Sequence, residues 1–186
     1  MTALSALWLP ILLSAAVVFV ASSIIHMALP WHKSDYPALP DEERFRGAVK
    51  PLAIPPGDYF VPRANDPKQM KTPEFCTKLT EGPVVIMTVL PNGPFAMGRN
   101  LGMWFVFCVA VGVITAYAAG LALAPGTPYL RVFRLTSVIA FAGYALALWP
   151  LSIWYRRAWS TTVKSTVDGL VYALLTAGVF GWLWPH

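Results

Sequence analysis

The stretch SSIIHMALPWHKSDY, from Ser22 to Tyr36, decides how this chain folds, because an apolar segment stops there and a proline-rich hydrophilic one begins. We interpret it as the water-facing end of a membrane helix. Two of the three histidines, His26 and His32, lie in this stretch. It also carries other polar and amphipathic side chains: Trp31, Lys33, Asp35 and Tyr36. Polar groups therefore gather at one membrane boundary, and the three later apolar segments must return to fixed sides of the membrane relative to it.

The composition places the chain in the membrane class. Of its 186 residues, 56% are hydrophobic and only 12% are charged, whereas about a quarter of the residues of an average soluble domain are charged. A helix that crosses the bilayer core needs about 20 mainly apolar residues. Four segments meet this requirement: 5–29, 99–123, 132–154 and 164–184.

The basic residues set the expected orientation. The net charge is +5, but the Lys and Arg residues lie in loops beside apolar segments, which favours membrane topology over nucleic-acid binding. Twelve of the 14 fall in 30–99 and 155–164, and only Arg131 and Arg134 lie on the other side. The positive-inside rule then places the hydrophilic stretch in the cytoplasm and both termini outside.

We predict a membrane all-α fold with four transmembrane helices and a small α+β extramembrane insertion between the first two. The first 29 residues lack a basic n-region and have an apolar run too long for a signal peptide, so we expect a retained first helix. Residues 30–97 form the proline-rich extramembrane domain, with 12 of the 17 prolines. Residues 98–186 hold the other three spans.

Within the extramembrane domain the sequence predicts one helix and two strands. Acidic residues 41–43 precede basic ones, which indicates a short helix that ends near Lys50, before Pro51. Residues 58–61 and 84–90 are apolar runs between turn signals, so we predict that they form strands and pair with each other. A two-stranded sheet is only marginally stable in water, and we therefore expect this domain to need external support.

Small residues recur at every fourth position of two predicted spans, a spacing that allows close helix packing. In the second span they are Gly98, Gly102, Gly112, Ala116 and Gly120. In the fourth they are Gly169, Ala173, Ala177 and Gly181. Pro150, inside the third span, predicts a kink there.

Asp168 is the carboxylate that most needs an explanation, because it lies about one turn inside an apolar helix, where ionisable groups are costly and often functional. A structural role is also open, since Lys164 lies four residues earlier on the same helix face. His26 and Arg99 are expected at similar depth in the same leaflet. We therefore predict an intramembrane polar cluster of His26, Arg99, Lys164 and Asp168, in which Asp168 pairs with one of the other three.

The sequence does not predict a catalytic, cofactor or metal site. His26 has Met27 and His32 nearby and could ligate haem or copper, but no His-x-x-x-His or Cys-x-x-Cys motif supplies convergent ligands. No Gly-rich phosphate loop or His-Glu-x-x-His motif is present. Arg131 and Arg134 project from one side of a helix and are candidate contacts for an anion or a lipid headgroup.

Several short motifs carry a resemblance over the whole chain. They are Ile25-His26-Met27, Leu29 to Tyr36, Pro56-Gly57-Asp58-Tyr59, Pro73-Glu74-Phe75, Asp168-Gly169-Leu170 and Gly181 to Pro185. With them the chain resembles an uncharacterised family of bacterial four-span integral membrane proteins. The resemblance implies a bacterial inner-membrane protein, and it brings no known activity and no catalytic residues.

Three functions follow from these observations. The first is a non-catalytic subunit or assembly factor of a larger bacterial membrane complex, with the lipid bilayer and other membrane-protein subunits as partners and no cofactor. The alternative is a small oligomeric transporter or proton-conducting protein that uses Asp168 and His26. The third is a membrane enzyme or a haem-binding subunit.

Overall fold

The computed structural model describes residues 1–186, and the chain is mostly helical with one small antiparallel sheet. Four helical segments are long and apolar enough to cross a membrane: Leu4–Ala28, Met97–Ala122, Tyr129–Tyr155 and Trp159–Trp182. The chain divides into two compact units. The helical unit comprises Met1–Pro37 and Ala96–His186. The second unit comprises Ala38–Phe95, and we call it the extramembrane unit after the position that the sequence predicts for it.

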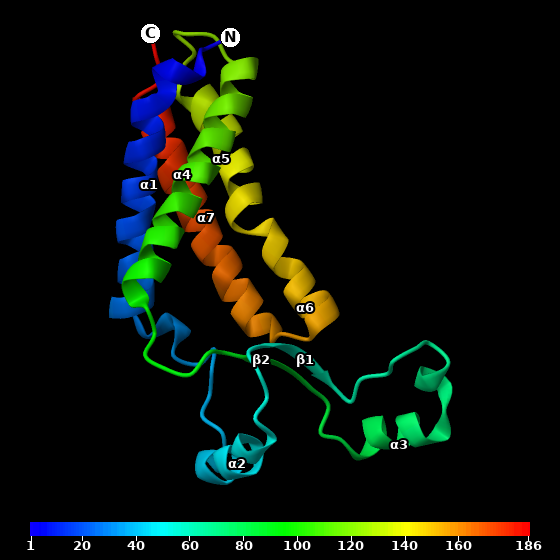
Figure 1. The fold of residues 1–186 in the computed structure, drawn as a ribbon. Helices are drawn as coiled ribbons and strands as arrows, with labels where there is room; N and C mark the ends of the chain where they lie inside the picture. The colour runs from blue at the N-terminus through cyan, green and yellow to red at the C-terminus, as the bar shows by residue number, and fades with distance from the viewer. The chain divides into compact units, whose positions relative to one another are not determined.

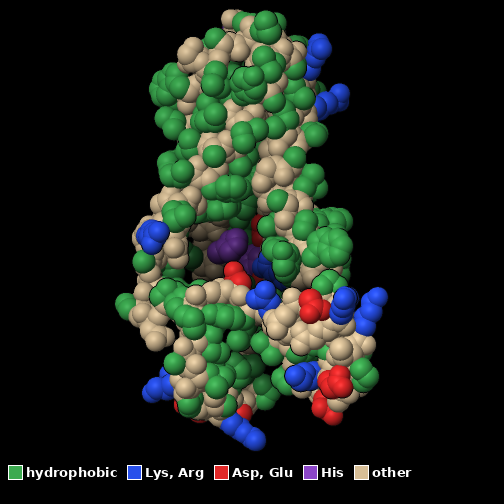
Figure 2. Space-filling view, turned by 45° about the vertical axis from the view of Figure 1, so that its right-hand side comes forward, with side chains coloured by type: hydrophobic (Ala, Val, Ile, Leu, Met, Phe, Trp, Pro, Cys, Tyr) green, Lys and Arg blue, Asp and Glu red, His purple; other side chains and the backbone are tan.

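The helical unit is a bundle whose long helices run alternately up and down, so that both termini lie at the same end (Figure 1). Its helices are α1 (Trp8–Ser23), α4 (Met97–Ala122), α5 (Tyr129–Tyr144), α6 (Trp149–Tyr155) and α7 (Trp159–Trp182). Helix α7 packs against both α1 and α5. Hydrophobic side chains cover much of the visible bundle surface, which suits contact with lipid (Figure 2).

The small-residue stripe of α7 is a packing face, as the sequence predicts. Gly169, Ala173, Ala177 and Gly181 are all buried. A Cβ atom added at Gly169 would lie 2.9 Å from the Cβ atom of Ala145. The close approach of α7 to the end of α5 therefore depends on the missing side chain at this position.

The corresponding stripe of α4 is only half a packing face. Gly112 lies against Ile11, and Gly120 lies against the backbone of Thr2. Gly98 and Gly102, in contrast, are exposed and have no atom within 4 Å of an added Cβ. The spacing allows close packing along the whole run, but the first two glycines have no neighbour in this chain, because α4 contacts the other helices mainly through its later turns.

The third span is broken where the sequence predicts a kink. Helix α5 ends at Tyr144, a 3-10 turn covers Leu146–Leu148, and α6 starts at Trp149 with Pro150 in its first turn. Proline lacks an amide proton and its ring clashes with the carbonyl group four residues earlier. The break therefore precedes Pro150.

The extramembrane unit contains the predicted helix and strands. Helix α2 (Glu42–Val49) begins at Asp41, whose carboxylate accepts a hydrogen bond from the Arg44 amide. Strands β1 (Gly57–Val61) and β2 (Val85–Val89) pair antiparallel, with Gly57 opposite Val89 and Val61 opposite Val85. The predicted pairing is thus confirmed.

A third helix in this unit is absent from the sequence prediction. Helix α3 spans Pro73–Glu81, and the hydroxyl group of Thr72 caps its first turn by accepting a hydrogen bond from the Phe75 amide. A threonine followed by Pro73 at the first helical position is itself a helix-start signal. The residues around this signal are mostly polar, so the signal alone did not predict a helix.

Candidate functional site

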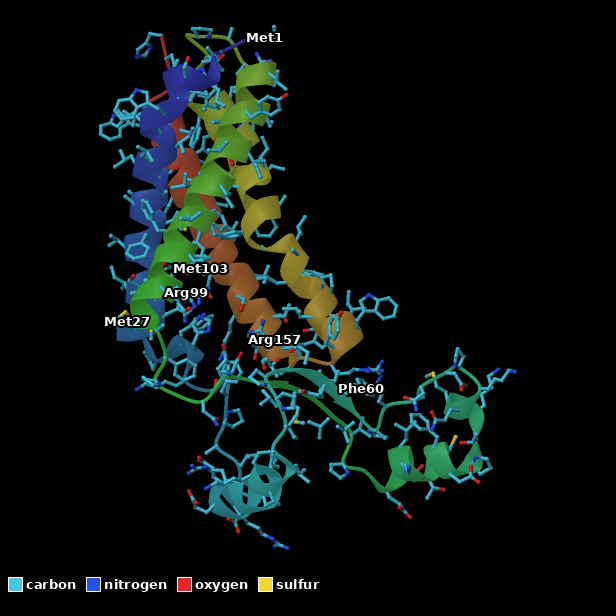
Figure 3. The ribbon with its side chains drawn as sticks, viewed as in Figure 1. Met1, Met27, Phe60, Arg99, Met103 and Arg157 are labelled. Atoms are coloured by element: carbon cyan, nitrogen blue, oxygen red, sulfur yellow. The ribbon has the colours of Figure 1, made fainter.

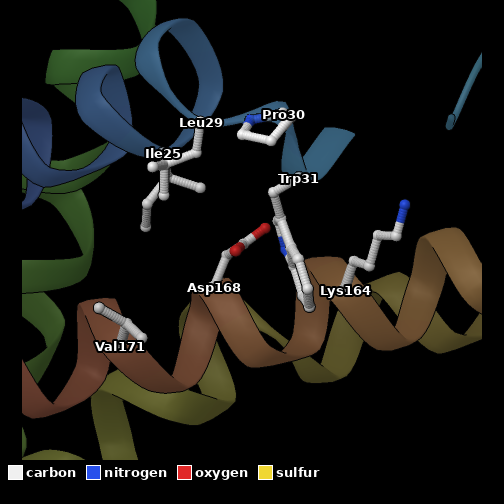
Figure 4. A pocket seen from close by; sticks show the side chains of 7 residues that line it. All are labelled: Ile25, Leu29, Pro30, Trp31, Lys164, Asp168 and Val171. Carbon is white, nitrogen blue, oxygen red and sulfur yellow. The ribbon is translucent and has the colours of Figure 1, made fainter. Parts of the chain in front are cut away.

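A polar cluster lies where the chain leaves α1. The helix first widens into one π-helical turn, Ile24–Ala28, and Pro30 then starts a 3-10 turn that ends at His32. Proline cannot continue the hydrogen bonding of the preceding helix. The chain therefore turns sideways over the first turns of α7, so that Pro30 and Trp31 lie close to Asp168 and Lys164 (Figure 4).

His32 lies between two carboxylates. Its Nδ1 atom is 2.7 Å from an oxygen of Asp35 and its Nε2 atom is 2.9 Å from an oxygen of Asp168. A carboxylate only accepts, so Nδ1 carries the proton that it donates to Asp35. Nε2 is fully buried and makes no hydrogen bond, although the Asp168 oxygen is only 2.9 Å away. The contact with Asp168 is close but is not a hydrogen bond.

Asp35 is held by a second cation. The Lys164 Nζ donates hydrogen bonds to Asp35, at 3.0 Å, and to Ser34, at 2.7 Å. It also lies 5.8 Å from the centre of the Trp31 ring. Burial raises the pKa of Asp35, but the hydrogen bonds and charges of His32 and Lys164 outweigh burial and hold the pKa below its usual value. Asp35 is therefore a carboxylate that fixes the orientation of His32.

His26 lies against a face of the His32 ring. The two imidazole rings are stacked, with centres 4.3 Å apart and planes 11° apart. The Nδ1 atom of His26 is 3.0 Å from the backbone oxygen of Ser22 and must be its donor, since a carbonyl oxygen only accepts. The metal-ligating atoms of His26, His32 and Asp168 all lie within 4.8 Å of one another.

The cluster opens into a pocket of about 660 Å³ whose walls are mainly apolar. Asp168 and Lys164 are its two charged residues. Its other lining residues are Ile25, Leu29, Pro30, Trp31 and Val171. Figure 2 shows histidine side chains inside a hollow beside acidic and basic ones. The buried carboxylate of Asp168, only 7% exposed, is thus reached through an apolar opening.

The predicted polar cluster of His26, Arg99, Lys164 and Asp168 is brought together only in part. Asp168 pairs with His32, which is none of the three partners we expected. Lys164 points to Asp35 instead of Asp168. Arg99, in the first turn of α4, is exposed and forms no ion pair (Figure 3).

Sequence reasoning missed His32 and Asp35 as members of the cluster. Both lie beyond the apolar segment, so spacing along a straight helix places them in water rather than against Asp168. The available signal was the position of Pro30, because a proline directly after an apolar run ends the helix and lets the chain change direction there. Nothing in the sequence fixed the direction of that turn.

Arg131 and Arg134 lie elsewhere in the bundle, on the first turns of α5. Both are exposed. They line a second pocket, of about 780 Å³, together with apolar residues of α5 and Leu123. Two guanidinium groups beside an apolar wall suit a lipid phosphate, and their role as an anion or lipid contact remains a prediction.

Comparison with protein-family models, curated proteins and solved structures finds no match to this chain.

Proposed function

We propose that this protein is a non-catalytic subunit or assembly factor of a larger complex in the bacterial inner membrane. One observation carries the proposal: Phe75 is the only buried side chain in the whole of Ala38–Phe95. A domain without a core cannot offset the entropy of ordering its chain. A partner that covers this unit would supply the missing burial.

The two-stranded sheet offers a surface for such a partner. Phe60 and Ile86 are opposite each other in the ladder and share one face of the sheet. They are 48% and 40% exposed. The same face carries Asp58 and Thr88, whose side chains are hydrogen-bonded at 2.6 Å. An apolar patch beside a fixed polar pair is a surface typical of protein association.

The exposed Gly98 and Gly102 give independent support, because small residues four apart on a membrane helix let a second helix approach closely. The distribution of Lys and Arg further supports a cytoplasmic extramembrane unit with both termini outside. In this arrangement partner contacts occur both in the membrane and in the cytoplasm.

A photocrosslinking amino acid in place of Phe60 tests the proposal in cells. We expect one stoichiometric partner, which also copurifies with the unmodified protein in mild detergent and protects β1 and β2 from amide exchange. The matched control carries the crosslinker at Arg46, an exposed and charged position on α2. A purified protein without any stoichiometric partner, and with β1 and β2 exchanging freely, contradicts the proposal.

A second candidate is favoured by the buried carboxylate of Asp168 beside two histidines. A small oligomeric transporter or proton-conducting protein would use Asp168 and His26 at the membrane boundary. The same purification separates the two functions, because a transporter is expected as a homo-oligomer without other subunits. Asp168→Asn would then abolish transport in liposomes without lowering the amount of protein.

A further inference from the structure

We propose that His26, His32 and Asp168 bind one divalent first-row transition-metal ion, such as Zn²⁺, at the end of α1. This inference goes beyond the subunit role and does not depend on it. Two imidazoles and one carboxylate form the donor set, and imidazole nitrogen favours Zn²⁺, Cu²⁺, Fe²⁺ or Ni²⁺ over Mg²⁺ and Ca²⁺.

The first argument is the protonation pattern of the two histidines. Each Nδ1 donates to an oxygen acceptor, the Ser22 carbonyl for His26 and the Asp35 carboxylate for His32. In the neutral ring, each Nε2 then presents a lone pair. Metal-ligating histidines are oriented in this way, with the second ring nitrogen bonded to a carbonyl or a carboxylate. Lys164 in turn fixes Asp35.

The second argument is the distance between His32 and Asp168. Two atoms bound to one metal at about 2.1 Å lie about 3.0 Å apart at a right angle and about 3.4 Å apart at the tetrahedral angle of Zn²⁺ sites. The 2.9 Å between Nε2 and the Asp168 oxygen is close to the first separation, and a small opening of this contact gives the second. A fully buried nitrogen and a carboxylate oxygen at this distance without a hydrogen bond repel each other. A shared cation removes the repulsion.

The third argument is charge. No Lys or Arg nitrogen lies within 4 Å of the Asp168 carboxylate, which is 7% exposed. A buried carboxylate without a cation is costly. Lys164 pairs with Asp35 and not with Asp168. A divalent ion at His26, His32 and Asp168 would compensate the negative charge of Asp168.

The position of His26 allows the site to close. Its ring lies in the π-helical turn Ile24–Ala28, and such turns are frequent at functional sites. The ligating atoms lie up to 4.8 Å apart, and the two stacked imidazole planes are only 11° apart, so their in-plane lone pairs do not converge. Binding therefore requires the exposed His26 ring to turn out of the stack and to move by about an ångström, until its nitrogen lies about 2.1 Å from the metal. Three protein ligands leave further positions for water or a partner's side chain.

Zn²⁺ titration of the full chain in detergent micelles tests the site, with a histidine-free purification tag and chelator-treated protein. We expect one Zn²⁺ per chain by calorimetry and elemental analysis. His26→Ala, His32→Ala and Asp168→Asn should each weaken binding by more than about 100-fold, and Asp35→Asn by about 10- to 100-fold. His186→Ala, which removes the remaining histidine, and Glu42→Gln, an exposed carboxylate, serve as matched controls.

A second measurement needs no variant. In the unaltered protein, Zn²⁺ should protect the exposed His26 but not His186 from diethylpyrocarbonate, as read by mass spectrometry. Absence of stoichiometric binding, or equal modification of His26 with and without Zn²⁺, overturns the proposal and leaves a histidine–carboxylate ion pair. Loss of binding in His186→Ala would instead place the metal at the C-terminus.

Discussion

The helical unit and the extramembrane unit differ in what holds them together. Every span of the helical unit buries side chains against a neighbouring helix, including Leu7, Cys108, Val132 and Phe180 at 0% exposure. The extramembrane unit buries Phe75 alone and relies on helix caps and a two-stranded ladder. The stability of the helical unit therefore depends on side-chain volume at close contacts. The stability of the extramembrane unit depends on local hydrogen bonds such as helix caps.

Replacing a phenylalanine by alanine should show the largest difference in stability loss between the two units. Phe180→Ala removes a fully buried ring from α7 and should lower the free energy of unfolding by about 3 kcal/mol through the cavity that it leaves. Phe45→Ala, at a half-exposed position of α2, should change it by less than about 0.5 kcal/mol. Thermal unfolding in micelles measures both. Equal losses would show that the extramembrane unit shares a core with the bundle.

Two glycine substitutions test close helix packing within the bundle. Gly169→Ala places a methyl group 2.9 Å from the Ala145 Cβ, which cannot move without its backbone, and should cost about 1 to 3 kcal/mol. Gly102→Ala meets no atom within 4 Å and serves as the control. The same unfolding measurement applies. If Gly102→Ala instead disrupts copurification with other subunits, its surface is a helix-docking face.

Removing the N-terminal cap of α2 tests whether the extramembrane unit depends on local hydrogen bonds. Asp41→Ala removes the acceptor for the Arg44 amide and should destabilise α2 by about 1 kcal/mol. Amide exchange of residues 42–49 should become about five-fold faster, while exchange of α7 stays unchanged. Unaltered exchange in α2 would mean that something other than its cap maintains this helix.

The smallest expected effect is a gain in stability. Gly47 lies in the interior of α2 with no atom within 4 Å of an added Cβ. Gly47→Ala should stabilise the helix by about 0.5 to 1 kcal/mol, because alanine loses less backbone freedom on folding. Slower amide exchange of residues 42–49 checks it. A loss of stability would indicate that a partner contacts the backbone of α2 at this position, where a side chain would be in the way.

Local composition and residue spacing were enough to predict most of the helices and strands. The length of the apolar segments predicted the four long helices. Acidic residues followed by basic ones predicted α2, and apolar runs between turn residues predicted the pairing of 58–61 with 84–90. The buried stripe of α7 followed from a four-residue repeat. The same reasoning missed α3, although Thr72 and Pro73 mark its start.

Which polar groups meet depends on how the chain turns in three dimensions. Residue spacing along the helices places Asp168 at the same membrane depth as His26, Arg99 and Lys164. This depth does not predict the direction in which the chain turns after Pro30. That turn brings His32 and Asp35 onto α7, so that Asp35 and Lys164, 129 residues apart in sequence, share a hydrogen bond. Likewise, equal spacing could not show that Gly112 packs and Gly102 does not, because that depends on where the neighbouring helices cross α4.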